Sequence, residues 1–198
     1  MQTTRRRFFG QLGRSLLADA VDALDSLRSE WASPDPPAAD GPVTRRWLRP
    51  PGALPESQFL STCTRCTACQ EACSYQSIRR LGPEFASLAG TPAVIPHESP
   101  CYLCEDMPCI AACAPLALLR VPRKEARMGL AVIDASACHV AQGQPCDYCV
   151  ARCPLRDAAI LWDASGLPRV IEGRCTGCGV CAYLCPAQAI VIVPGATE

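Results

Sequence analysis

The residues of this chain best suited to chemistry are its cysteines. There are 16 in 198 residues, and all fall in four groups that each end in Cys-x-x-x-Cys. The groups are Cys63, Cys66, Cys69 and Cys73; Cys101, Cys104, Cys109 and Cys113; Cys138, Cys146, Cys149 and Cys153; and Cys175, Cys178, Cys181 and Cys185. Three thiolates at intervals of three residues can surround one iron–sulfur cubane, while the fourth ligates a second one. The first and fourth groups have this spacing; the second and third each contain a lengthened gap.

Disulfides and zinc are the alternative uses of so many cysteines. Eight disulfides would suit an oxidising compartment, but they do not require cysteines at i, i+3 and i+6 in one loop, four times over. Zinc sites use paired Cys-x-x-Cys motifs without the third and fourth cysteine seen here. Sixteen thiolates at four per cubane give four [4Fe–4S] clusters with no cysteine left over. We therefore predict that all sixteen cysteines bind iron.

The segments between the cysteine groups predict an α+β fold. Short apolar stretches follow or precede the groups, which is typical of short strands separated by Gly and charged turns. They are 118–119, 130–133, 159–161, 170–171 and 189–192. Residues 59–194 then form a body of four cluster-binding units (59–90, 91–125, 126–166 and 167–194), arranged as two bacterial two-cluster ferredoxin-like domains.

The spacing leaves the pairing of the units open. Sequential pairing joins unit one with two and three with four, whereas nested pairing joins one with four and two with three. Nested pairing is slightly preferred here, because it places both regular motifs in one domain.

The first 58 residues differ from the rest. Thr4–Gly10, TRRRFFG, looks like a twin-arginine export motif, but the following stretch is charged and has the period of an amphipathic helix, so we expect such a helix within residues 1–31. Residues 32–58 contain seven prolines, which predicts a Pro-rich linker. Trp47 and Leu48 are expected to pin that linker to the body.

Charge and motifs exclude several functions. Nineteen basic residues balance nineteen acidic ones, which gives no support for nucleic-acid binding. No apolar stretch is long enough to predict a transmembrane helix. There is no P-loop and no nucleophile–base set, so we expect neither catalysis nor a small-molecule substrate.

Several residues near the cysteines have a predicted secondary role. Cations beside the motifs could raise a cluster's reduction potential or be ordinary surface arginines: Arg65, Arg152 and Arg174. Apolar residues within the motifs should exclude water: Leu103, Met107, Ile110, Val180 and Tyr183. The basic run Arg120, Arg123, Lys124 and Arg127 is interpreted as a solvated loop rather than a docking site. His97 and His139 are lone histidines, and His139 is interpreted as a surface residue rather than a ligand.

Five stretches together resemble one family. They are Arg49–Ala53 (RPPGA), CTRCTAC from Cys63, Cys101 to Cys109 (CYLCEDMPC), Arg127–Val132 (RMGLAV), and Cys138 to Pro154. This pattern, over roughly residues 45–194, resembles the NapG/MauM group of ferredoxin-type proteins. The resemblance implies electron transfer from a membrane quinol-oxidising protein toward a terminal oxidoreductase, as in nitrate reduction or methylamine oxidation. A related cytoplasmic ferredoxin-type protein of the nitrate system, tied to maturing the reductase, suggests the alternative of an accessory factor.

We therefore expect an electron carrier with redox-protein partners, or a maturation factor for a molybdenum or similar reductase. The expected location is cytoplasmic and peripheral to the membrane, because the charged helix argues against an export core. Export to the periplasm through the twin-arginine motif is the alternative.

Overall fold

The computed structural model of the chain describes residues 47–195, which belong to one compact unit. The predicted helix of residues 1–31 and most of the predicted linker lie outside them. None of the helices in the described part has the length and hydropathy that a membrane span requires. The elements, in chain order, are α2 (Glu56–Thr62), α3 (Ala68–Glu71), β1 (Ile78–Arg80), a 3-10 helix (Pro83–Leu88), β2 (Pro92–Val94), α4 (Pro108–Ala111), β3 (Gly129–Ile133), α5 (Tyr148–Ala151), β4 (Ile160–Trp162), β5 (Pro168–Val170), α6 (Val180–Leu184) and β6 (Ile190–Pro194).

The strands form three two-stranded antiparallel sheets, and the fold is α+β. In the second half of the body, β3 pairs with β6, with Gly129 opposite Pro194, and β4 pairs with β5, with Ile160 opposite Val170. Each half of the body therefore has an outer pairing of its first and last segments and an inner hairpin. In the first half the hairpin is β1–β2, and a single bridge between Ala53 and Leu118 takes the place of the outer sheet.

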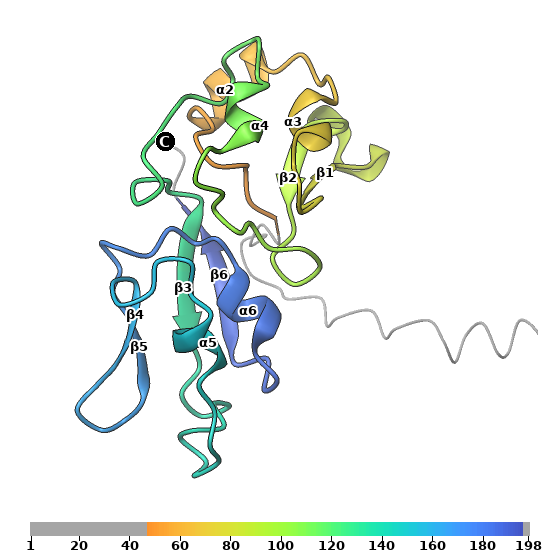
Figure 1. Cartoon of the computed structure of the whole chain (residues 1–198). Coiled ribbons are helices and arrows are strands. Elements are labelled where there is room, and N and C mark those ends of the chain that lie inside the picture. The colour runs from red at the N-terminus through yellow and green to blue at the C-terminus, as the bar shows by residue number, and fades with distance from the viewer. Residues whose placement is uncertain (1–46, 196–198) are drawn as a thin grey trace, which may run out of the picture. The chain divides into compact units, whose positions relative to one another are not determined.

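Figure 1 displays the same division in space: α2, α3 and α4 gather around β1 and β2, whereas α5 and α6 lie beside β3 and β6. The apolar stretches that predicted strands at 130–133, 159–161 and 189–192 correspond to β3, β4 and β6. The sequence did not predict β1 and β2. Two exposed arginines end β1 and a proline begins β2, so neither strand has the usual apolar pattern.

A repeated turn follows the last cysteine of a unit. Gln76, Leu116 and Gln188 each lie three residues after such a cysteine and have positive φ. In each case the backbone N–H donates to the carbonyl of that cysteine, at 2.9, 3.0 and 3.1 Å. The turn ends the short helix and directs the chain into the next strand.

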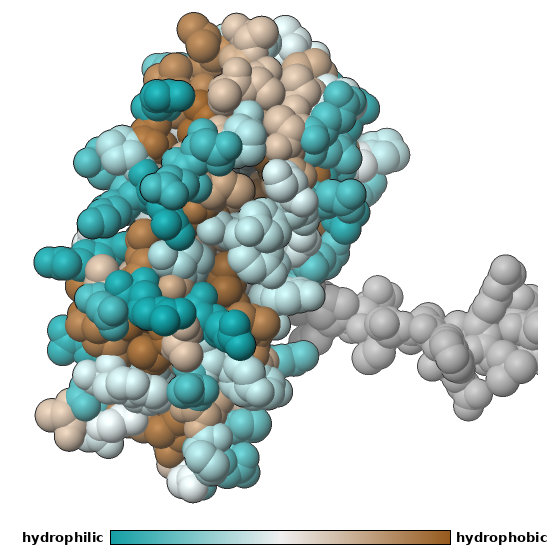
Figure 2. All heavy atoms as spheres, in the orientation of Figure 1, coloured by the Kyte–Doolittle hydropathy of each residue, from teal (hydrophilic) through white to brown (hydrophobic). Residues whose placement is uncertain are grey.

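The core is assembled from residues just after these turns. Ile78, Leu118, Ile160 and Ile190 each begin a strand or bridge after the fourth cysteine of a unit, and all are buried. They belong to one apolar cluster that also includes many of the cysteines. On the surface, hydrophobic and hydrophilic side chains are interspersed over the face drawn in Figure 2. The apolar core is therefore centred on the cysteine loops.

The last part of the predicted linker is packed, which differs from the expectation of an extended segment up to residue 58. Trp47 and Leu48 are buried, as the pinning role predicted, and Pro50 and Pro51 are fully buried. Gly52 has φ +76, and a Cβ there would overlap the carbonyl oxygen of Leu119. Prolines lack only the backbone donor, so they can pack as apolar residues wherever no ladder hydrogen bond is needed.

Candidate iron–sulfur centres

The sixteen cysteines line four cavities, with four cysteines at each. We call them site A (Cys63, Cys66, Cys69 and Cys113), site B (Cys73, Cys101, Cys104 and Cys109), site C (Cys153, Cys175, Cys178 and Cys181) and site D (Cys138, Cys146, Cys149 and Cys185). Their empty volumes are about 300, 370, 380 and 360 Å³, respectively. Every cysteine is a free thiol, so disulfides play no part in this arrangement.

The grouping is sequential, and our preference for nested pairing was wrong. Three cysteines of unit one meet the last cysteine of unit two, and the same exchange joins units three and four. Strand pairing is the cause. Leu118 bridges to Ala53, just before the first cysteine loop, and this brings Cys113 back to that loop. Nested pairing would need β6 to reach the first unit, but β6 pairs with β3.

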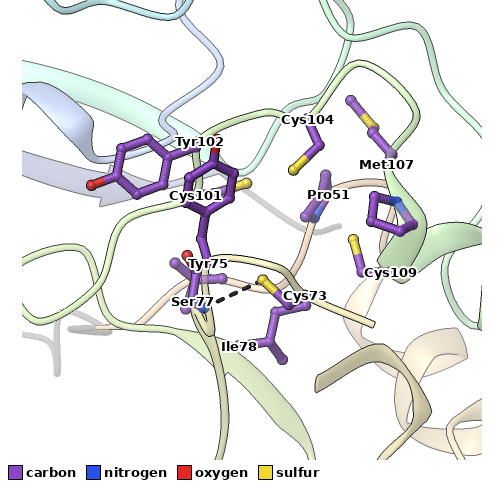
Figure 3. A pocket seen from close by; sticks show the side chains of 12 residues that line it. Pro51, Cys73, Tyr75, Ser77, Ile78, Cys101, Tyr102, Cys104, Met107 and Cys109 are labelled. Carbon is purple, nitrogen blue, oxygen red and sulfur yellow. Dashed lines mark hydrogen bonds between the residues drawn. The ribbon is translucent and has the colours of Figure 1, made fainter. Parts of the chain in front are cut away.

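Site B illustrates how the cysteines are held (Figure 3). Cys73 follows α3, Cys101 and Cys104 come from the loop before α4, and Cys109 lies within α4. Met107 lines the cavity and is buried. Tyr75 and Tyr102 stack beside the cavity, with ring centroids 4.4 Å apart, although Tyr75 remains 54% exposed. This aromatic pair separates one edge of site B from solvent.

Backbone N–H groups point at several of the thiols. Ser77 donates to the Sγ of Cys73 at 3.3 Å, which is the dashed line in Figure 3. Leu118 donates to Cys113 at 3.4 Å and Ala189 to Cys185 at 3.3 Å, while Gly177 donates to Cys175 at 3.4 Å. The first three bonds follow from the repeated turn. Such donors favour a thiolate and are one of the means by which proteins adjust cluster potentials.

The second cysteine of three units follows a residue with positive φ. These residues are Arg65, Leu103 and Gly177, each in the middle of a Cys-x-x-Cys pair. A left-handed residue here curls the loop around the cavity. A Cβ at Gly177 would overlap the backbone of Gly129, so the fourth unit uses glycine where the others carry side chains. This contact joins the RMGLAV stretch to site C, reinforced by Met128 N–H donating to the Thr176 carbonyl at 2.9 Å.

Burial sets the protonation of the thiols. It raises the pKa of Cys101 and Cys109 in site B to about 12, from an ordinary value of 9.0. Burial also raises the pKa of Cys69, Cys149 and Cys178 to about 11, with neighbouring thiols adding to the effect. By contrast, the backbone N–H of Ala68 lowers the pKa of Cys66, the one exposed cysteine. Iron binding must therefore displace protons from most sites.

The donor set at each cavity fits an iron–sulfur cluster. Within residues 47–195, no three His, Cys, Asp or Glu side chains are close enough to share one metal ion. Tetrahedral zinc would hold four sulfurs about 2.3 Å from a common centre. Here the thiols instead surround cavities lined mainly by apolar groups, and thiolate is the donor that [4Fe–4S] clusters take.

The other predicted residues have mixed outcomes. Leu103, Met107, Ile110 and Val180 are buried, as expected, but Tyr183 is 46% exposed. His139 is half-buried and lines site D. The guanidinium of Arg65 donates to the Ser87 carbonyl at 3.0 Å.

Sequence reasoning missed the role of Arg49. The residue is 4% exposed, forms two bonds to Glu56 (2.6 and 3.1 Å), and donates to the Thr91 hydroxyl and the Pro92 carbonyl. Its guanidinium also lies over the Trp47 and Phe59 rings. Arg49 thus fixes the RPPGA stretch beside site A. In the sequence, the RPPGA stretch itself was the available signal for this role.

Comparison with known protein sequences identifies relatives that are ferredoxin-type proteins. Residues 168–191 match the family model described as a 4Fe-4S binding domain. The chain is 40% identical over 148 residues to the methylamine utilization ferredoxin-type protein MauM of Methylorubrum extorquens, covering 70% of this chain and 67% of that protein. It is also 40% identical over 162 residues to the ferredoxin-type protein NapG of Escherichia coli, covering 74% and 70%. The ferredoxin-type protein NapF of Escherichia coli is 33% identical over 158 residues, which cover 76% of this chain and 90% of NapF.

Proposed function

Because this chain belongs to the NapG/MauM family of ferredoxin-type proteins, we propose that it relays electrons through four [4Fe–4S] clusters, one at each of sites A to D. The family carries iron–sulfur centres and works in electron transport. Each bound cluster would supply one-electron redox chemistry at its cysteines. The chain's own residues supply the thiolates, the N–H donors to sulfur and the apolar lining.

The order of the sites carries this proposal. Sites A and B exchange cysteines, and Cys69 and Cys109 are close enough for their charges to interact. Sites C and D also exchange cysteines, and Cys149 of site D is close enough to Cys181 of site C for their charges to interact. Between B and C, the N–H of Cys101 donates to the carbonyl of Cys178 at 2.9 Å. The four sites are thus neighbours in the order A–B–C–D, with A and D at the ends of that order.

A series of neighbouring centres suits a relay between two proteins. Site A has the exposed Cys66, and site D has the half-exposed Tyr148, so both ends are accessible from solvent. We propose that one end receives electrons from a membrane quinol-oxidising protein and that the other delivers them to a terminal oxidoreductase. The chain itself then acts as an electron carrier rather than a catalyst. We place it in the cytoplasm, peripheral to the membrane, with twin-arginine export as the alternative.

Cluster content is the direct test. Anaerobic purification followed by iron and sulfide assay should give about sixteen irons and sixteen sulfides per chain, and redox-titrated EPR should resolve the reduced clusters. Fewer than about three cubanes per chain would rule out the relay. A fusion of residues 1–40 to a reporter that is active only after export tests the location.

A maturation role is the second candidate, suggested by the resemblance to the ferredoxin-type protein tied to maturing the nitrate-system reductase. A maturation factor would bind an apo-reductase, with residues 1–31 as the recognition element. Deleting residues 1–31 separates the roles. Loss of reductase loading with intact electron transfer would make maturation the main function.

A further inference from the structure

The connection between the two halves places the cation Arg123 beside sites B and C, which are the two inner sites of the order A–B–C–D. Arg123 lies between the last cysteine of unit two and β3. Its Nη2 donates to the carbonyl oxygen of Pro154 at 3.1 Å, in a part-buried hydrogen bond. Pro154 directly follows Cys153 and lines site C. Arg123 therefore reaches back from the connection to a ligand loop of the other half, which a solvated loop residue would not do.

The guanidinium is also incompletely paired. Its Nε is buried and has no hydrogen-bond partner among the described residues. A buried donor without an acceptor is costly, and thiolate or sulfide sulfur is the class of acceptor that a loaded site would add nearby.

The charge of Arg123 acts on both inner sites. The Arg123 guanidinium lies within electrostatic range of Cys104 in site B and of Cys153 in site C. One cation is thus close to a ligand of site B and to a ligand of site C. These are the two sites that the Cys101–Cys178 hydrogen bond joins.

We propose that Arg123 is a positioning residue that raises the reduction potentials of the two inner clusters together by holding one cation at the junction of sites B and C. The proposal rests on the proposed function. Reduction adds negative charge to a cluster, and a nearby cation in a part-buried setting stabilises that charge. The same cation attracts both reduced clusters and so offsets part of the repulsion between them.

Redox-titrated EPR of the loaded full chain tests this assignment. In Arg123→Gln, two of the four midpoint potentials should fall and the other two should stay within error of the wild type. Cys104→Ser identifies which signal belongs to site B. Arg123→Lys keeps the charge and should restore most of the shift. Arg120→Gln is the matched control, because Arg120 is an exposed arginine of the same connection.

The outcomes separate this proposal from the relay itself. Four clusters with unchanged potentials in Arg123→Gln, an equal fall in all four, or no recovery in Arg123→Lys would each overturn the role of Arg123 and leave the relay intact. Fewer than about three clusters in the wild type would instead overturn the relay. If Arg123→Gln does not take up clusters, Arg123→His replaces it in the test, because the histidine loses its positive charge as pH rises. The two potentials should then fall with pH more steeply than in the wild type, and parallel pH profiles would refute the proposal.

Discussion

The backbone N–H of Cys101 donates a hydrogen bond to the carbonyl oxygen of Cys178, with 2.9 Å between nitrogen and oxygen. The two residues are 77 positions apart in sequence, and each belongs to a different half of the body. Cys101 lines site B and Cys178 lines site C. This bond connects the two halves, each of which exchanges cysteines internally. It makes sites B and C neighbours.

Sequential pairing predicts which cysteine substitutions alter the same EPR signal. Cys73→Ser and Cys104→Ser should alter the same EPR signal, because both thiols line site B. Cys66→Ser should alter a different signal, although Cys66 and Cys73 belong to the same sequence motif. The measurement is EPR of each reduced variant purified anaerobically. A common signal for Cys66→Ser and Cys73→Ser, separate from that of Cys104→Ser, would contradict the pairing.

The close approach of Gly177 to Gly129 predicts a large effect of one methyl group. Gly177→Ala must accept positive φ, at about 1–2 kcal/mol, and must also displace the Gly129 backbone, at roughly 1–3 kcal/mol more. Gly166→Ala is the control, since Gly166 has similar φ but open space around it. Chemical unfolding measures both. Equal losses of stability in the two variants would show that the contact is unimportant.

The buried Arg49–Glu56 pair predicts a stability loss on removal of either partner. Glu56→Ala leaves the Arg49 charge buried without its carboxylate and should cost about 3–5 kcal/mol. Arg79 and Glu98 form a matched control: they are 57% and 59% exposed and 3.8 Å apart, so Glu98→Ala should cost about 1 kcal/mol or less. Denaturant midpoints of the loaded protein decide the matter. A cost below about 1 kcal/mol for Glu56→Ala would refute a structural role for the pair.

The raised thiol pKa values predict the order in which acid removes the clusters. A thiol with a higher pKa holds its proton more strongly, so protons compete with iron at a higher pH. Site B has two thiols with pKa of about 12, whereas site A has one of about 11 and the lowered pKa of Cys66. As pH falls, site B should therefore lose its cluster before site A. EPR signals assigned with Cys104→Ser and Cys66→Ser follow this loss. Loss of the site A cluster at a higher pH than the site B cluster would contradict the inferred effect of burial on cluster binding.

Much of the candidate site was predictable because cluster ligation is encoded locally. A Cys-x-x-Cys-x-x-Cys loop places three thiols around one cavity with little help from distant residues, as CTRCTAC does at site A. Strands β3, β4 and β6 were likewise visible as short apolar runs. The strands β1 and β2 were not, because their stability comes from pairing with each other and with Leu48 rather than from an apolar pattern.

The sequence by itself determined the four cysteine groups and the α+β character, since these depend on residue type and on spacing within short segments. Only the tertiary structure decided which sites the fourth cysteines complete, because strand pairing between distant segments carries Cys113 to site A and Cys185 to site D. It also decided the place of Arg123. In sequence Arg123 is one of four cations in a basic run, but the fold of the second half brings Pro154 within hydrogen-bonding distance of its guanidinium. A contact of this kind depends on turns of the chain that lie tens of residues away in sequence. A local sequence pattern carries no information about those turns.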